Sequence, residues 1–190
     1  MKKQPELTAL TRENLIEAFW SLYRQKKIEQ ISIKEITDKA GYNRSTFYEY
    51  FVDIYDLLEQ LEAALLTHMR ETALKTMPLR QEADIIQRMA EVYEEKGYYL
   101  SVLLGENRDP EFANKIKAIM RPALKDLFGL VEDEIHTGYI FEFASSAMLA
   151  TITHWYKSGK NLPSQELISL VRSMLTGGVF PVIRQYARPS

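Results

Sequence analysis

Residues 41–51, with the sequence GYNRSTFYEYF, combine aromatic rings with polar side chains that form strong hydrogen bonds. If the stretch is helical, Phe47 and Phe51 lie four residues apart and share one face. Arg44, Ser45 and Tyr48 then lie on the other side. Such a helix fits the major groove of DNA, where a guanidinium at its start can bind both acceptors of a guanine edge. We interpret this stretch as a surface that reads DNA.

Hydroxyl groups flank the arginine. Thr46 and Tyr50, together with Ser45 and Tyr48, can reach phosphates or the methyl group of thymine. Charge alone does not favour this interpretation, since residues 1–60 hold nine Lys and Arg against ten Asp and Glu. The alternative is a surface turn of a helical bundle whose tyrosines are half-buried, and the residue pattern leaves it open.

The residues before this stretch predict the elements that position it. Ser32 and Glu35 have the spacing of a capping box, which marks the start of a short helix. Gly41 follows where a helix end favours a positive φ, and Asn43 can cap the next helix, expected to run to about Phe51. Two short helices joined by Gly-Tyr-Asn form a helix-turn-helix.

An amphipathic helix precedes this pair. In TRENLIEAFWSLYRQK, a single face carries Leu15, Phe19, Leu22 and Tyr23, and Thr11 is the expected N-cap. After the pair, a fourth helix begins near Asp53 and continues to Pro78.

Helical spacing dominates the rest of the chain, and ISI at 31–33 is the only run that resembles a strand. Further helices are expected at about 80–96, 98–105, 109–128, 133–158 and 164–176, with a last short one from Val182 to Tyr186. The predicted fold is all-α. We place a three-helix helix-turn-helix domain at residues 8–55 and a larger antiparallel helical domain at 56–190.

Composition excludes several classes of protein. The chain has no cysteine, so it forms no disulfide and has no thiolate metal site. His68, His136 and His154 lack metal-ligand spacing, and no phosphate-binding loop or nucleophile elbow is present. We expect no enzyme activity, no cofactor and no metal. The start of the chain does not read as a signal peptide, and the longest apolar stretch, YIFEFASSAMLATITHWY, is too polar to span a membrane. The expected location is the cytoplasm.

The stretch ISIKEITDKAGYNRSTFYEYFVDIYDLLEQLE resembles the N-terminal signature of the TetR family of bacterial transcription regulators, and the resemblance covers about residues 10 to 60. It implies a DNA-binding domain followed by a helical domain that binds an effector and forms a homodimer. It also implies repression that a small ligand relieves. The DNA-contacting positions it implies are Lys34, Asn43, Arg44, Ser45, Thr46, Tyr48 and Tyr50.

Three positions depart from the family pattern. Ile54 stands where the family often has a phosphate-binding lysine, and Val52 where a basic residue is frequent. The glycine common after the first helix is absent, with Lys27 near that point. These departures keep a second hypothesis open, a protein-binding co-regulator that has the fold but does not bind DNA alone.

The C-terminal half resembles the family more loosely, in YIFEFASSAMLATITHWYKSGKNLPSQELISLVRSML. In the family, the last two long helices of each protomer pair into a four-helix bundle. Small residues at 144–150 would permit close approach here, and internal packing is the alternative. Apolar and aromatic side chains suggest a ligand pocket between helices, with core packing again the alternative for each of its candidates: Met89, Tyr93, Tyr98, Phe112, Met120, Phe141 and Trp155.

Overall fold

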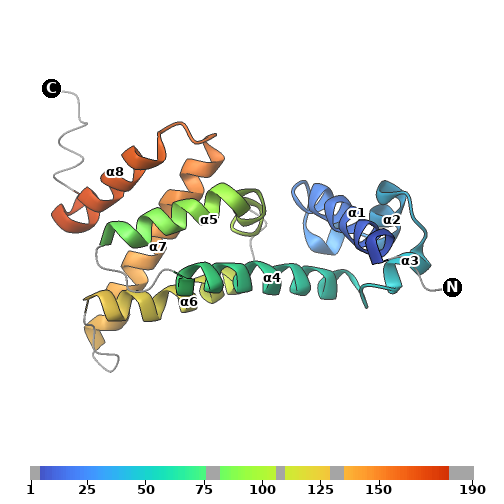
Figure 1. The fold of residues 1–190 in the computed structure, drawn as a ribbon, viewed down its shortest axis with the longest axis horizontal. Coiled ribbons are helices and arrows are strands. Elements are labelled where there is room, and N and C mark those ends of the chain that lie inside the picture. Colours follow the sequence, from blue (N-terminus) through green and yellow to red (C-terminus); the bar gives the residue numbers. More distant parts are fainter. Residues whose placement is uncertain (1–4, 76–81, 106–109, 129–134, 180–190) are drawn as a thin grey trace. The chain divides into compact units, whose positions relative to one another are not determined.

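The computed structural model describes residues 5–75, 82–105, 110–128 and 135–179. All regular elements in this part of the chain are helical, which confirms the predicted all-α class (Figure 1). In chain order they are α1 Pro5–Tyr23, the 3-10 turn η1 Ile28–Gln30, α2 Ile33–Ala40, α3 Arg44–Tyr48, α4 Ile54–Lys75, α5 Glu82–Leu103, α6 Pro110–Phe128, α7 Ile135–Lys157 and α8 Ser164–Gly177.

The chain divides into two compact units. The N-terminal unit, Met1–Leu65, holds α1, α2, α3 and the first part of α4, and α2 packs against both α1 and α3. Its core consists of side chains from every one of these helices, all fully buried: Leu15, Phe19, Ile36, Phe47 and Leu57. Burial of this apolar surface is the main stabilising contribution to the unit.

The first helix starts earlier than the sequence predicts. α1 begins at Pro5, and Thr11 lies inside it, where its hydroxyl donates to the carbonyl of Leu7 at 2.8 Å. The prediction of Thr11 as an N-cap is therefore wrong: a threonine hydroxyl can bond a carbonyl one turn back as well as a free amide at a helix start. The predicted inner face is otherwise largely confirmed, with only Leu22 half-buried.

The turn between α2 and α3 has the predicted capping residues. Ser32 and Glu35 form the capping box, Gly41 adopts φ 77°, and the Asn43 side chain accepts from the backbone N–H of Thr46. Because only a residue without Cβ takes that φ easily, Gly41 lets the chain turn sharply. α3 ends at Tyr48, before the predicted end at Phe51.

The C-terminal unit holds α5 to α8 and the later part of α4. α5 packs against α7 and α8, and α6 packs against α7 (Figure 1). Its core includes Leu100, Leu103, Ile116 and Ile152, none of which is exposed. A salt bridge between Lys117 of α6 and Glu142 of α7 reinforces the second contact, and it holds the pKa of Glu142 below its ordinary value.

Two expected helices, 80–96 and 98–105, are one. α5 runs from Glu82 to Leu103 and passes through Gly97 without a break. Gly97 is buried, and a Cβ there would overlap the ring of Tyr156 on α7. This glycine therefore serves close packing between helices and does not end a helix. The last predicted helix, from Val182 to Tyr186, lies outside the described residues.

Candidate nucleic-acid interface

The short helix α3 separates apolar from polar residues as its sequence predicts. Phe47 is fully buried, and its ring packs on that of Phe51 with a centroid distance of 5.3 Å. Arg44 and Ser45 are exposed, and the side chain of Tyr48 is 58% exposed. The polar groups thus share an outward surface, carried by a helix that the two phenylalanines anchor to the core.

The other residues predicted to contact DNA differ in how exposed their side chains are. Lys34 and Asn43 are also exposed, whereas Thr46 and Tyr50 are half-buried. The ring of Tyr50 lies beside that of Phe51, 6.2 Å between centroids. Tyr50 therefore presents less of its surface to a partner than Tyr48 does.

Asn43 organises the start of α3. Its side-chain oxygen, Oδ1, accepts from the backbone N–H of Thr46 at 3.0 Å, from the Thr46 hydroxyl at 3.0 Å and from the Ser45 hydroxyl at 2.5 Å. These bonds fix the rotamers of three side chains on the outward surface. A binding surface ordered in this way loses less conformational entropy when a partner docks.

Contacts from α1 hold this surface in place. The Arg12 guanidinium lies over the Phe51 ring, 5.4 Å from its centroid, and donates to Oε1 of Gln60 on α4 at 3.0 Å. The Asn14 amide donates to the Tyr42 hydroxyl in the turn at 3.1 Å. Both contacts join residues far apart in sequence, so they orient the turn relative to α1 and the start of α4.

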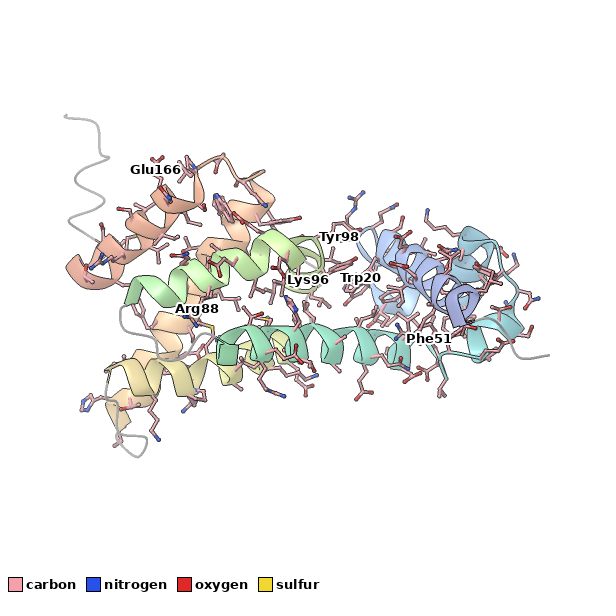
Figure 2. All side chains as sticks on the ribbon, in the orientation of Figure 1. Trp20, Phe51, Arg88, Lys96, Tyr98 and Glu166 are labelled. Atoms are coloured by element: carbon pink, nitrogen blue, oxygen red, sulfur yellow. The ribbon has the colours of Figure 1, made fainter. Side chains whose placement is uncertain are left out.

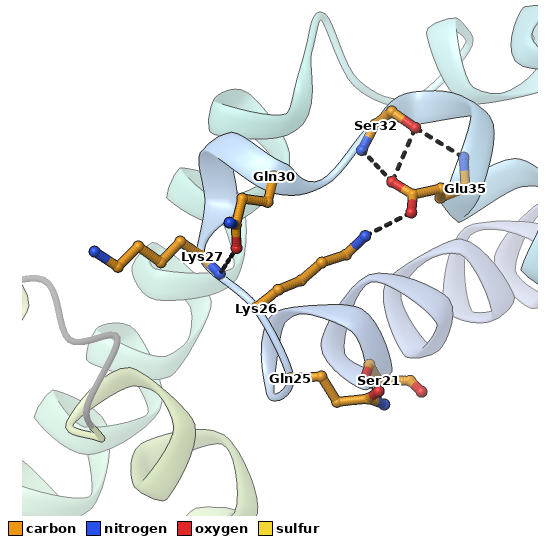
Figure 3. Close-up of polar contacts among 7 residues, drawn as sticks. All are labelled: Ser21, Gln25, Lys26, Lys27, Gln30, Ser32 and Glu35. Atoms are coloured by element: carbon orange, nitrogen blue, oxygen red, sulfur yellow. Dashed lines mark hydrogen bonds and ion pairs between the residues drawn. The ribbon is translucent and has the colours of Figure 1, made fainter.

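Two cations of α2 and its approach form ion pairs within the unit. Lys34 pairs with Asp38 at 2.5 Å. Lys26 pairs with Glu35 at 2.5 Å (Figure 3). The Glu35 carboxylate also accepts from the backbone N–H and the hydroxyl of Ser32. The bond from Lys26 and those from Ser32 lower the pKa of Glu35 to about 2. Lys34, the predicted phosphate contact on α2, thus already has an anionic partner.

Of the two apolar departures from the family pattern near the start of α4, Val52 is the more exposed. The sequence does not single out Tyr55, which is also exposed. Val52 is 77% exposed and Tyr55 is 58% exposed, whereas Ile54 is half-buried. Two carboxylates fix the local backbone: Asp53 Oδ1 accepts from Asp56 N–H, and Asp56 Oδ2 accepts from Val52 N–H, both at 2.8 Å. Helical spacing alone cannot distinguish these neighbours, because which of them faces outward depends on how the start of α4 packs within the N-terminal unit.

The candidate ligand-binding residues lie in the core of the C-terminal unit. All of them are buried except Tyr98, which is half-buried and labelled in Figure 2. The Tyr93 hydroxyl lies 2.7 Å from Thr153 Oγ1, which itself donates to the Leu149 carbonyl, so Tyr93 donates to Thr153. Burial raises the pKa of Tyr93, and its hydroxyl keeps its proton. This polar group is satisfied without a ligand.

α7 carries an exposed apolar stripe that the residue pattern does not predict. Ile135, Tyr139 and Phe143 recur every fourth residue and are 79%, 75% and 71% exposed, and Ile140 beside them is 51% exposed. In contrast, Ser145, from the predicted small-residue seam, is fully buried and donates to the Phe141 carbonyl at 2.7 Å. The other small residues of the predicted seam are half-buried or, at Ala150, exposed, so the seam stays a prediction. The large exposed apolar side chains of α7 lie nearer its start.

Other kinds of site find no support in the described residues. No group of three His, Asp or Glu side chains there comes together as metal ligands do. Among the described helices, none combines the length and apolar character that crossing a membrane requires.

The fold and the outward face of α3 define a helix-turn-helix transcriptional regulator. A family model for bacterial regulatory proteins of the tetR family matches residues 15–61, and a model for a transcriptional regulator C-terminal region matches residues 81–177. The second match alone covers half of the chain. The protein belongs to the TetR family of transcriptional regulators.

Solved structures of low sequence identity share the fold. A TetR transcriptional regulator from Streptococcus agalactiae matches with a TM-score of 0.66 at 18% identity, over 89% of this chain and 95% of its own. The fatty acid degradation regulator FadR from Bacillus halodurans matches with a TM-score of 0.65 at 17% identity, over 95% and 99%. The dihydroxyacetone kinase operon activator DhaS matches with a TM-score of 0.54 at 17% identity, over 88% and 94%. No curated protein sequence matches the chain.

Proposed function

We propose that this regulator binds an operator in double-stranded DNA as a homodimer and represses transcription until a small ligand releases it. One observation carries the proposal: α3 is anchored by the buried Phe47 and turns Arg44, Ser45 and Tyr48 outward together. A major groove accepts a helix of this kind, with the polar side chains directed at base edges and the adjoining phosphates.

The exposed groups divide into two roles. Arg44 carries a guanidinium whose paired N–H donors match O6 and N7 of guanine, so it supplies base discrimination. Tyr48 presents a hydroxyl at the flank of the helix, where it donates to a phosphate and fixes the register without reading sequence. Lys34 adds a phosphate contact when its ammonium group leaves the Asp38 carboxylate and binds a DNA phosphate instead.

The exposed stripe on α7 supports the homodimer. In the single chain, α7 has a solvent-exposed apolar surface formed by Ile135, Tyr139, Ile140 and Phe143. A second copy that covers the same surface buries these side chains in a symmetric interface. A symmetric dimer also presents two copies of α3, as recognition of a palindromic operator requires.

The proposed effector binds inside the C-terminal unit. The candidate residues from Met89 to Trp155 line the interior of the C-terminal unit and are mainly apolar and aromatic. A ligand that enters among them is therefore mostly apolar, and the core must repack to admit it. The ligand releases the protein from DNA if the ligand-bound protein binds the operator less tightly than the ligand-free protein does.

Two measurements on the full chain test the proposal. Selection from a pool of random duplexes should enrich one palindromic sequence, and binding to that sequence should weaken steeply as salt increases. The DNA that flanks its own reading frame is the natural second target. A chain that enriches no sequence and binds no duplex at low salt contradicts the proposal.

The second candidate is a protein-binding co-regulator without autonomous DNA binding. Two observations favour it: Lys34 is paired with Asp38, and apolar Val52 is strongly exposed beside α3. The first neutralises a cation on the surface that would face DNA, and the second leaves that surface without a charge to bind phosphate. Absence of DNA binding by a folded dimer would support this candidate.

A further inference from the structure

Residues 49–53 form the α3–α4 junction, and two side chains from outside this segment hold it. The Arg12 guanidinium of α1 lies over the Phe51 ring, 5.4 Å from its centroid. The Asp56 carboxylate of α4 accepts from the backbone N–H of Val52 at 2.8 Å. Because α3 has only five residues, it is too short to be stable alone, and its direction depends on the segments at its two ends.

The Gln60 side chain on α4 connects these two contacts. Its Oε1 accepts from the Arg12 guanidinium at 3.0 Å, and its Nε2 donates to the Asp56 carboxylate, 3.2 Å from each oxygen. Gln60 is half-buried, and both contacts are partly shielded from water. The hydrogen bonds therefore run without interruption from Arg12 through Gln60 and Asp56 to the backbone of Val52.

The chemistry of the two neighbours requires an amide at position 60. A guanidinium can only donate hydrogen bonds, whereas an ionised carboxylate can only accept them. The side chain between Arg12 and Asp56 must therefore accept on one side and donate on the other, as the amide of Gln60 does. Since Arg12 can only donate, the Gln60 atom that faces it must be the oxygen, and this requirement fixes the orientation of the amide.

We propose that Gln60 is a positioning residue that sets the direction of α3 through Arg12 and Asp56. Its consequence for operator recognition rests on the proposed DNA binding. A bidentate contact from Arg44 to a base needs α3 in one orientation, because two hydrogen bonds must align at once. Phosphate contacts do not read sequence and form on any duplex. Loss of the Gln60 contacts should therefore weaken binding to the operator more than binding to random duplex.

Gln60→Met tests the inference, because it keeps a side chain of similar length but makes neither hydrogen bond. The ratio of operator affinity to random-duplex affinity should fall about 5-fold or more, a loss of the size that one bidentate base contact supplies. The Val52 amide proton should exchange with solvent about 2- to 10-fold faster by NMR, because its hydrogen bond to Asp56 loses its support. The matched control is Gln25→Met, which removes an exposed amide contact near the end of α1 and should change neither measurement.

An exchange of amide and acid between positions 60 and 56 distinguishes positioning from packing. Gln60→Glu places a second carboxylate against Asp56, so it should lower the affinity ratio and speed the exchange of the Val52 amide. Adding Asp56→Asn restores the pattern: the new amide donates to the new carboxylate, which accepts from Arg12, and the amide oxygen accepts from Val52 N–H. The double variant should return both measurements to within about 2-fold of wild type, the tolerance of a double-mutant cycle.

The possible results separate this inference from the proposed function. A wild type that binds no duplex contradicts the proposed function, and the exchange of the Val52 amide then decides alone whether Gln60 holds the α3–α4 junction. An unchanged Val52 exchange rate in Gln60→Met overturns the inference, as does a double variant no closer to wild type than Gln60→Glu. Equal losses of operator and random-duplex affinity in a folded Gln60→Met also overturn it, because they would show that α3 keeps its direction without Gln60.

Discussion

The ring of Tyr156 on α7 occupies the space that a side chain at Gly97 on α5 would need. A Cβ at position 97 would overlap Cδ2 and Cε2 of the ring and lie 3.0 Å from Cζ. Gly97 is buried, and α5 and α7 pack against each other. The absence of a side chain therefore permits the close approach of these two helices.

Gly97→Ala should destabilise the protein although alanine favours helices. Overpacking of this kind typically costs about 1–3 kcal/mol of the free energy of unfolding. The cost arises because the Tyr156 ring must move away from position 97 on α5. The matched control is Gly138→Ala on α7, where a Cβ meets nothing within 4 Å. That variant should gain up to about 1 kcal/mol from helix propensity. Urea unfolding measures both, and equal stability of the two variants would contradict the packing role of Gly97.

A comparison of Gly41 with Gly97 shows which structural features the sequence can predict. Gly41 was correctly predicted at a helix end because its neighbours Ser32, Glu35 and Asn43 form a local capping pattern. The expected break between helices 80–96 and 98–105 is wrong, because the role of Gly97 depends on Tyr156, which is remote in sequence. Local hydrogen bonds leave local signatures, whereas packing between helices does not.

The outward surface of α3 was predictable for a related reason. The spacing of Phe47 and Phe51 fixes the buried face of one short helix, and the exposure of Arg44, Ser45 and Tyr48 follows. The α7 stripe was not predicted, because a helix with apolar residues on most of its circumference has no periodicity that separates core from surface. Only the packing of α5, α6 and α8 against α7 leaves Tyr139 and Phe143 uncovered.

Glu35→Gln should lower the melting temperature near neutral pH, because it removes the anion that binds Lys26 while the contact with Ser32 can remain. The pKa of Glu35 falls from an ordinary 4.5 to about 2 on folding. Its stabilising effect is therefore present above about pH 4.5 and lost as the pH falls toward 2. The difference in melting temperature between wild type and variant should shrink over that interval.

The control for this prediction is Asp38→Asn, which breaks the exposed pair with Lys34. An exposed pair one helical turn apart contributes little, about 0.3–0.5 kcal/mol. A loss in Glu35→Gln no larger than in Asp38→Asn, or a difference from wild type that persists at pH 2, would show that the Glu35 contacts do not stabilise the fold.

Phe143→Arg should dissociate the proposed homodimer, because a symmetric interface on α7 would bury an unpaired charge from each protomer. Phe143 is 71% exposed in the single chain, so the substitution should leave the monomer folded. Gln87→Arg, which adds the same charge at an exposed position on α5, is the control. Sedimentation velocity at micromolar concentration should give a monomer for the first and a dimer for the second. If Phe143→Arg sediments as the wild type does, the stripe is not the interface.

Arg44→Ala should weaken binding to the selected operator by about 1–3 kcal/mol and relax the base preference at one position in each half-site. Tyr48→Phe removes only the hydroxyl, and it should weaken operator and random duplex by similar factors, since a phosphate contact carries no base information. Selection with each variant and titration against both duplexes measure the two effects. An unchanged preferred sequence in Arg44→Ala would show that another residue reads that base.

The exposed apolar residue beside α3 provides a test between DNA binding and the co-regulator. Val52 is 77% exposed, whereas Ile54, the position of the family's lysine, is half-buried. Val52→Lys should therefore add a cation without disturbing the core, and Ile54→Lys should lower the melting temperature. If this face docks on DNA, each new phosphate contact steepens the slope of log affinity against log salt by about 0.9, or about 1.8 per dimer.

Val52→Gln, polar but uncharged, is the control and should leave the slope unchanged. Affinity of Val52→Lys for random duplex should rise together with affinity for the operator, because phosphate contacts do not read sequence. A folded Val52→Lys variant with an unchanged slope would mean that the surface beside α3 does not approach the phosphates. The exposed Val52 and Tyr55 side chains would then fit the surface of a protein partner better than that of DNA, as the co-regulator hypothesis requires.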